Sequence, residues 1–402
     1  MMFLGCSFTN FEVDWLAYEY WSECADEPYW NFPCFRNASY HSWRDQLLHS
    51  TDYGKVYEAA AEMQEILLYE CPIIICYENE LTFAYRTDKF EGYVIDVIND
   101  VFGWWTNYKV HLKSSMGGLF GGTFRLGNLL GVDTFNFMTT SSAYSRSVLN
   151  QLYDSLMVSG PDGRNVLWLA ESYIAQTHAD DPAVQEGHTR FIFDMIQNAT
   201  WTDGVPMMAE DVAYSLNYYH DGTGNPYGAD LINMTAAYAR SAYQVVVEFN
   251  TESYWHLQNV AYKPIIPKHV FLSVGPNGWN TWNPHPPGEA MVTSGPFNVS
   301  NYVHGSFCEE ARNPHYFYGV PADERTTSPT TSTNETTDGG SGAPWYDWLN
   351  RVLGEVNPAS LVITAGSIAV IVVVLFRWRR EMGHIGLSHA IPNARLDSGD
   401  GS

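Results

Sequence analysis

The chain is poor in positive charge. Its 402 residues include 21 Lys and Arg against 45 Asp and Glu, so the formal net charge is −24 at pH 7. A nucleic-acid-binding surface needs basic side chains to contact phosphates, and this balance excludes that function. Charged residues make up only 16% of the chain, whereas 45% are hydrophobic and 15% aromatic. This composition is typical of a folded, acidic, aromatic-rich protein, and the length predicts two or three domains.

Common catalytic and nucleotide-binding motifs are also missing. The sequence contains no H-E-x-x-H, no G-x-S-x-G and no G-x-x-x-x-G-K-[ST], the patterns of zinc proteases, serine hydrolases and nucleotide-binding loops. Its six cysteines do not form the paired C-x-x-C spacing that binds zinc. We therefore expect neither enzymatic activity nor a cofactor or resident metal.

The cysteines are few enough to be considered one by one. Outside the cell, Cys6, Cys24 and Cys34 are candidates for a disulfide, and the sequence leaves the pairing open. Cys71 and Cys76 flank a short apolar run, and this position predicts small buried core residues for both.

One long uncharged run lies near the C-terminus. Residues 356–376 carry no charge, and their length suits a tilted helix that crosses a bilayer, although a buried core helix is the alternative. Arginines follow at once, and Lys and Arg stay on the cytoplasmic side. The pattern predicts a single-pass membrane protein with a cytoplasmic tail at 377–402 and the bulk of the chain outside. Residues 321–344, rich in Thr, Ser and Gly, predict an extended stalk. Five N-x-S/T sequons support this topology, one of them in the stalk: Asn37, Asn198, Asn233, Asn298 and Asn334.

The first residues do not match that topology. They show no basic segment followed by an apolar stretch of adequate length, as an export signal would have. Either export depends on a feature that the sequence does not reveal, or Met1 is not the true beginning of the protein.

Helix and strand patterns alternate along the outer part. Residues 40–70 have helical spacing, and a short buried strand is expected after them. Further on, the patterns predict a strand within 121–137, a helix over 141–158 and another over 208–219. They also predict strands at 189–196 and 242–250. The fold class is therefore α/β with a mixed sheet.

Four ordered motifs carry a family resemblance. They are the stretch GGTFRLGN to LWLAESY (121–173), FIFDMIQNATWTDGVPMMAEDV (191–212), YKPIIPKHVF (262–271) and TSGPFNVSNY (293–302). Together they resemble the N-terminal part of the family 5 extracellular solute-binding proteins, the dipeptide, oligopeptide and nickel receptors of ABC importers. Residues 115–320 are accordingly interpreted as this early part. Residues 1–105 resemble the C-terminal part of the same family. The resemblance implies periplasmic-binding-protein-like lobes.

The order of these segments departs from the family. The late segment comes first, and the large middle lobe that should join the two is missing from this sequence. In one interpretation the protein is a permuted receptor whose two segments pack together, since adjacent termini tolerate permutation. In the other it is the C-terminal section of a longer tandem receptor.

The resemblance also implies ligand-binding residues in the early segment. Asn136 and Phe137 stand at the family's L-N-P position, with Phe in place of proline. Tyr144 and Tyr153 follow, near where relatives line the cleft. Gly295 belongs to T-S-G-P-F, which resembles the family's glycine turn beside the crossing between lobes.

In the late segment, Asp14 falls where relatives carry an acidic loop that can pair with a peptide's amino group. The W-T-D-G-V-P block at 201–206 and the A-E-D-V that follows are interpreted as structural, because Glu210 and Asp211 fall in the first turn of a helix.

These observations predict a membrane-anchored extracellular solute-binding protein. It would bind a peptide or similar small solute and deliver it to the permease and ATPase subunits of an ABC importer. The alternative is a surface adhesion or sensory module that kept the fold without transport.

Overall fold

A computed structural model describes residues 13–25, 31–74, 82–118, 121–128, 130–289 and 291–318. Nearly all of these residues belong to one compact unit, formed by 1–76 and 83–331. The predicted stalk, membrane span and cytoplasmic tail lie outside the described residues. Within the described ranges, no helix has the length and apolar character needed to cross a membrane.

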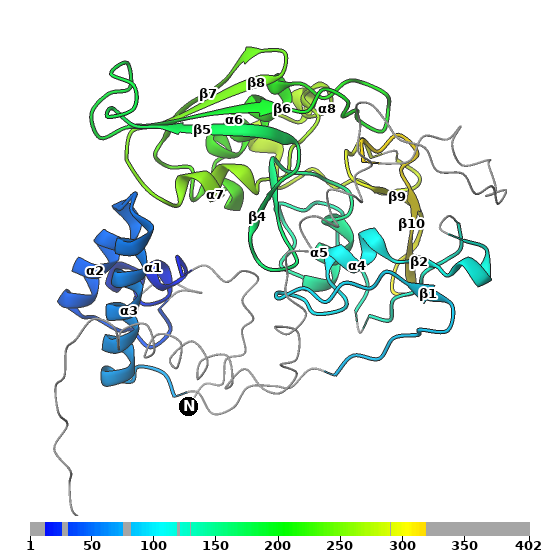
Figure 1. Cartoon of the computed structure of the whole chain (residues 1–402), viewed down its shortest axis with the longest axis horizontal. Coiled ribbons are helices and arrows are strands. Elements are labelled where there is room, and N and C mark those ends of the chain that lie inside the picture. The colour runs from blue at the N-terminus through cyan, green and yellow to red at the C-terminus, as the bar shows by residue number, and fades with distance from the viewer. Residues whose placement is uncertain are drawn as a thin grey trace, which may run out of the picture. The chain divides into compact units, whose positions relative to one another are not determined.

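The largest sheet among the described residues has four strands (Figure 1), in the order β5-β6-β8-β7. Its strands are β5 (Ala170–Gln176), β6 (Thr189–Met195), β7 (Met234–Ser241) and β8 (Gln244–Phe249). Both predicted strands, at 189–196 and 242–250, are confirmed. Every strand pair in the described ranges is antiparallel. The α/β prediction is confirmed. The predicted mixed sheet is not found among the described strands: β7 and β8 form an antiparallel hairpin, and β6 pairs antiparallel with β8.

The sheet buries one face against helix α6 (Ala209–Asp221), as Figure 1 shows. Alternate residues of β6 point into the core, among them Phe191 and Phe193. The predicted helix at 208–219 is confirmed. In its first turn Asp211 accepts a hydrogen bond from the backbone N–H of Met208, the N-cap residue, at 3.0 Å. The other oxygen of Asp211 accepts from the N–H of Lys268 at 3.1 Å. Asp211 therefore has the structural role expected of it.

Short elements complete the body. Before the sheet come β1 (Phe90–Glu91), α4 (Trp104–Lys109), β2 (His111–Leu112), α5 (Ala143–Leu149), β3 (Met157–Ser159) and β4 (Asn165–Leu167). After it come α7 (His256–Ala261), α8 (Lys268–Val274), β9 (Phe297–Val303) and β10 (Phe307–Arg312). Single 3₁₀ turns occur at Ser22–Cys24, Ser114–Met116, Pro226–Gly228 and Pro276–Gly278.

Two sequence predictions in this region are wrong. The strand expected within 121–137 does not form in its described residues. The helix expected over 141–158 stops at Leu149. The backbone turns there because the carbonyl of Gln151 accepts from Phe297, and that of Leu152 accepts from Ser294 and Gly295. These tertiary bonds replace the helical ones.

Three helices form the N-terminal part of the unit: α1 (Leu16–Glu19), α2 (Ala38–His49) and α3 (Tyr53–Glu70). Asn37 and Asp52 cap α2 and α3 through their side chains, at 3.0 and 3.1 Å. The helical spacing predicted over 40–70 is confirmed, although it forms two helices, α2 and α3, and not one. Val56 and Met63 of α3 are fully buried in one cluster with residues of α1 and α2. This small core also includes Trp255, which comes from the loop after β8.

The structure tests the predictions made for Cys71 and Cys34. Cys71 ends α3 with a left-handed backbone and is exposed, so its prediction as a core residue is wrong. Ile74, in the expected buried strand, is 77% exposed; Cys76 lies outside the described residues. The thiol of Cys34 is free and donates to the carbonyl of Ala25 at 3.2 Å. The predicted disulfide therefore does not include Cys34, and Cys6 and the side chain of Cys24 are outside the described part.

Candidate functional site

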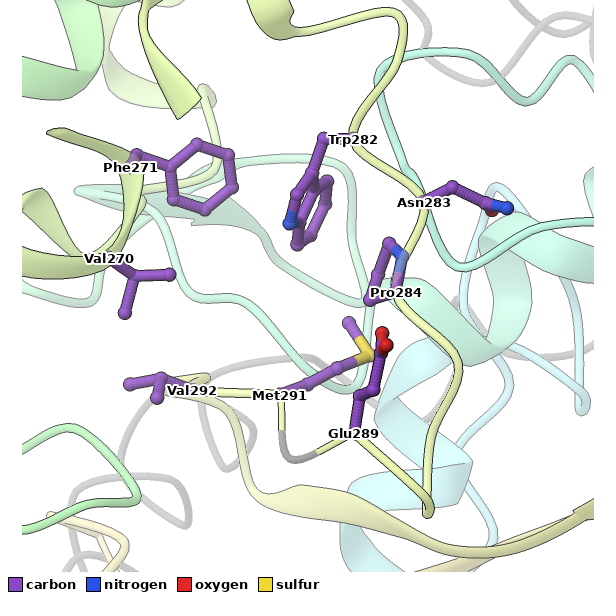
Figure 2. Close-up of a pocket in the computed structure, with 8 residues that line it drawn as sticks. All are labelled: Val270, Phe271, Trp282, Asn283, Pro284, Glu289, Met291 and Val292. Atoms are coloured by element: carbon purple, nitrogen blue, oxygen red, sulfur yellow. The ribbon is translucent and has the colours of Figure 1, made fainter. Parts of the chain in front are cut away.

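A small pocket opens between helix α8 and the loop that precedes β9. Its volume is about 160 Å³. Figure 2 shows the rings of Phe271 and Trp282 beside one another, with Met291 and Glu289 extending toward Pro284. The lining consists of Val270, Phe271, Trp282, Asn283, Pro284, Glu289, Met291 and Val292.

Helix α8 supplies one wall of the pocket. Phe271 is 1% exposed, and its ring packs edge-on against Tyr218 of α6 at 5.5 Å between centroids. Trp282 lies over the same ring at 4.7 Å, tilted by 54°. An aromatic pair in this geometry gives a rigid apolar surface. The α6–α8 packing thus fixes the inner wall of the pocket.

The rim of the pocket is polar. Glu289 and Asn283 are both exposed. The Glu289 carboxylate accepts a hydrogen bond from the backbone N–H of His285 at 3.2 Å, which closes a short loop. The Asn283 amide nitrogen lies 3.1 Å from Nε2 of His285, and its side chain points away from the two rings (Figure 2). An apolar interior with few polar groups at its edge is the usual composition of a small-molecule pocket.

The side chain of Asn136 fixes the loop that carries Trp282 by hydrogen bonds to its backbone. Its side chain is 1% exposed, and its amide donates to the carbonyls of Trp279 and Trp282, each at 2.7 Å. Its oxygen accepts from the N–H of Met138 at 3.0 Å. Both hydrogens of the amide nitrogen are therefore used in bonds to the protein itself. The predicted site residue Asn136 therefore positions Trp282 in this structure.

Two more predicted site residues adjoin it. The ring of Phe137 lies 6.4 Å from that of Trp282 and 5.0 Å from that of Tyr153. Tyr153 is buried, and its hydroxyl has no hydrogen-bond partner among the described residues. Burial raises the pKa of this phenol above its ordinary value. Phe137 and Tyr153 thus form the packed layer beneath the pocket.

Gly295 lies at a close approach of two backbones. Its N–H donates to the carbonyl of Leu152 at 2.8 Å. A Cβ at this position would lie only 2.2 Å from the carbonyl oxygen of Gln151. Only glycine fits this crossing without displacement of the chain.

The two remaining predicted residues lie elsewhere. Tyr144 is half-buried on α5, where its carbonyl accepts from the hydroxyl of Ser147 at 2.8 Å. Asp14 precedes α1, and its carbonyl accepts from the N–H of Ala17 at 2.9 Å. Neither residue belongs to the pocket lining described above.

Sequence reasoning missed a buried carboxyl group. Asp154 is 3% exposed, and its Oδ1 accepts from the indole of Trp168 at 3.0 Å and the hydroxyl of Tyr316 at 2.9 Å. Its Oδ2 has no partner among the described residues. Burial raises the pKa of Asp154 to about 7, against the lowering effect of its hydrogen bonds. Its partners are distant in sequence, so no local pattern could have revealed it.

A second depression, which is polar, lies at the end of the sheet where β5 and β8 begin and β6 and β7 end. It has a volume of about 360 Å³ and includes Glu171, Ser172, Asp194 and Gln244 in its lining. Asp194 accepts from Ser172 at 2.9 Å and from Gln244 at 2.7 Å. No group of three or more His, Cys, Asp or Glu that could hold a metal ion occurs within the described ranges.

The sequence of this chain is similar to those of solute-binding and transporter-binding proteins. Residues 165–339 match the family model described as bacterial extracellular solute-binding proteins, family 5 Middle. A probable ABC transporter-binding protein of Deinococcus radiodurans is 28% identical over 210 residues, which are 49% of this chain and 33% of that protein. The probable peptide-binding protein YejA of Agrobacterium fabrum is 26% identical over 198 residues, 49% of this chain and 31% of the relative.

Solved structures also show partial similarity to this chain. The oligopeptide-binding protein AppA of Bacillus subtilis, in complex with a nonapeptide, gives a TM-score of 0.41 at 20% identity over 48% of this chain and 36% of its own. NikA of Brucella suis, in complex with Fe(III)-EDTA, gives 0.39 at 21% identity over 48% and 36%. The chain spans about a third of the length of the curated relatives it matches. The predicted resemblance to the family 5 extracellular solute-binding proteins is confirmed by the family match and the curated relatives.

Proposed function

We propose that this chain is the extracellular solute-binding component of an ABC importer and that it binds peptides or chemically similar small solutes. The observation that carries this proposal is the family match at 165–339, joined by two relatives whose names are those of transporter-binding and peptide-binding proteins. The chain would work with permease and ATPase subunits and would have no catalytic role.

The geometry of the pocket supports binding. A receptor needs an apolar surface of fixed shape and a few polar anchors, and it needs no nucleophile. Phe271 and Trp282 provide the surface, while Asn136 fixes the loop that presents Trp282. Asn136, Phe137, Tyr153 and Gly295 would then act by shaping the site, and Tyr144 and Asp14 would contact solute at other points.

The proposal includes a membrane anchor. Residues 356–376 would span the bilayer, 321–344 would form the stalk and 377–402 would be the cytoplasmic tail. Two features of the sequence support the anchor: the uncharged run and the arginines directly after it. An extracellular position also agrees with the matched family model, which describes extracellular solute-binding proteins.

The organisation of the two receptor-like segments also belongs to the proposal. Both interpretations, a permuted receptor and the end of a tandem receptor, stay open. The hydrogen bond from Trp255 to Leu47 supports an arrangement in which the late and early segments pack together.

Ligand-induced stabilisation tests the function. The full 402-residue chain is heated in detergent with defined pools of short peptides, oligosaccharides and metal chelates. A binding solute raises the unfolding free energy by RT ln(1 + [L]/Kd), about 2.7 kcal/mol at a hundredfold excess over Kd. A rise in melting temperature with peptides is expected. No rise with any pool would contradict the proposal.

A further inference from the structure

The two edges of the four-stranded sheet differ in their protection. The sheet ends in β7 on one side and β5 on the other (Figure 1). At the β7 edge, the side-chain amide of Asn217 on α6 donates to the carbonyl of Ala237 at 2.8 Å, and two register shifts interrupt the strand. At the β5 edge, the backbone of residues 172–176 bonds to β6 alone among the described residues. The β5 edge is therefore open.

The middle of β5 has none of the usual devices that prevent pairing with another chain. Edge strands are commonly protected by a charged side chain, a proline or a bulge. In β5 the only charge, Glu171, and the only register shift, between Ala170 and Ser172, both lie at the start of the strand. The regular stretch 172–176 after them contains neither charge nor proline. Ile174, at its centre, is 54% exposed.

This regular stretch is complementary to itself. In an antiparallel pair of two identical stretches, the twofold axis passes through the middle residue, so Ile174 lies opposite Ile174 of the second copy. Tyr173 then lies opposite Ala175, whose small side chain leaves room for the ring. Ser172 lies opposite Gln176, and two polar groups meet. No two like charges face each other within the stretch, which removes the usual obstacle to pairing of identical strands.

Ile174 also ends an apolar row that crosses the sheet. Its cross-strand partner is Ile192, the partner of Ile192 is Val246, and the partner of Val246 is Tyr238. Ile192 alternates with core-facing residues such as Phe193, so the row lies on the face away from α6. The register centred on Ile174 continues this row into the second copy without a polar interruption.

We propose that two copies of this chain pair through the open β5 edge, antiparallel and centred on Ile174, and join their sheets into one. The paired stretch has five residues on each side, against about 20–30 in a standard stable interface. The dimer is therefore weak, with a Kd of about 10 µM to 1 mM. The net charge of −24 on each copy opposes association, so the dimer strengthens as salt screens that repulsion.

Sedimentation velocity of the full-length chain in detergent tests the contact over this concentration range, at low and high salt. We expect a monomer–dimer equilibrium in the wild type. Ile174→Lys sets two ammonium groups against each other at the twofold axis and should weaken the dimer about tenfold or more. The matched control is Ile232→Lys, which changes an isoleucine that is 77% exposed in the turn before β7. It should leave the equilibrium unchanged.

Hydrogen exchange of the wild-type chain locates the contact without any substitution. Pairing satisfies backbone N–H groups on the open side of β5, so exchange within 172–176 should slow as protein concentration rises. Exchange in β9 should not depend on concentration. Ile174→Lys should remove the concentration dependence in β5, and its melting temperature confirms that the variant is folded.

Three results would overturn the inference. The first is a wild-type chain that stays monomeric up to about 1 mM at high salt. The second is a dimer that persists in Ile174→Lys or that forms without slower exchange in 172–176, since the contact would then lie elsewhere. The third is slower exchange in β5 that follows added peptides and not protein concentration. That result would mean that the edge receives a peptide strand and not a second copy.

Discussion

The indole Nε1 of Trp255 donates a hydrogen bond to the carbonyl oxygen of Leu47 at 2.8 Å, although the two residues are 208 positions apart. The hydroxyl of Ser253 donates to the neighbouring carbonyl of Leu48, and the N–H of Tyr254 donates to Ser50 at 2.8 Å. The loop after β8 thus satisfies carbonyl groups at the C-terminal end of α2, which have no partner within the helix. These bonds join residues 47–50, in the N-terminal helical part, to residues 253–255, in the loop after β8.

Removing that indole should loosen the joint. Trp255→Phe keeps an aromatic ring in the small core but leaves the buried carbonyl of Leu47 without its donor. We expect a loss of about 1–3 kcal/mol in the free energy of unfolding, measured by denaturant titration of the full chain.

The matched control is Trp279→Phe, which removes a similar indole bond to the carbonyl of Thr223 at an exposed site. It should cost less, because water can replace the lost donor. Equal losses in the two variants would contradict the role assigned to the Trp255 bond.

Gly295→Ala should destabilise the body strongly. The added Cβ would lie 2.2 Å from the Gln151 carbonyl oxygen, so one backbone must move and its hydrogen bonds must lengthen. We expect a loss of roughly 2 kcal/mol or more by denaturant titration. Gly127→Ala is the control, because a Cβ there meets no atom within 4 Å. An unchanged stability in Gly295→Ala would refute the close crossing.

Asp154 should make stability fall as pH rises. Its pKa is about 7 in the folded protein against an ordinary 3.8, so between these values the folded state binds a proton that the unfolded state has released. Its contribution is fully present below pH 3.8 and is lost as pH rises through 7. The loss is on the order of 4 kcal/mol.

Asp154→Asn removes this titration. The variant should gain stability relative to the wild type as pH increases from 4 to 8, and unfolding titrations across that range measure the gain. The groups that face this carboxyl are Trp168, Ser294 and Tyr316 by hydrogen bonds, with Tyr108 close by. A constant difference between variant and wild type at all pH values would contradict the raised pKa.

His256 should act with the opposite sign. Its ring stacks on Phe249 at 3.9 Å, and its Nε2 lies 2.9 Å from the hydroxyl of Thr251. Burial lowers the pKa of His256 to about 4 from 6.5. As pH falls from 6.5 toward 4, the unfolded state takes up a proton that the folded state does not, and stability decreases by about 3 kcal/mol.

The variant His256→Phe keeps the stacked ring and removes the titrating group. It should flatten the loss of stability between pH 6.5 and 4, whereas Asp154→Asn changes the slope in the other direction. Circular dichroism of thermal unfolding at closely spaced pH values measures both. A wild-type slope retained in His256→Phe would exclude His256 as its source.

Local patterns predicted the parts of the fold that local forces decide. Side chains alternate between the two faces of a strand, so Phe191 and Phe193 of β6 lie together on the buried face of the sheet. The start of α6 follows from Asp211 in its first turn, whose carboxylate accepts from the backbone N–H of Met208. The prediction that the helix continues past Leu149 was wrong, because the carbonyl groups of Gln151 and Leu152 accept hydrogen bonds from residues more than 140 positions away. No periodicity within the segment contains that information.

The same distinction applies to the candidate site. The resemblance pointed to Asn136 and Phe137, and the structure places both behind Trp282. The pocket itself could not be predicted, since Phe271 and Met291 meet only after α8 and the following loop have packed. Asp154 carried no signal, because its environment is made by Trp168 and Tyr316 from separate parts of the chain.

Direct recovery of bound solute tests the central claim. The full-length chain is incubated with a random pool of short peptides, separated from free peptides by rapid gel filtration and denatured, and the released molecules are identified by mass spectrometry. The account predicts peptides retained in a fixed ratio to protein and lost when the chain is unfolded before incubation. Retention no greater than that of the unfolded chain would contradict a solute-binding function.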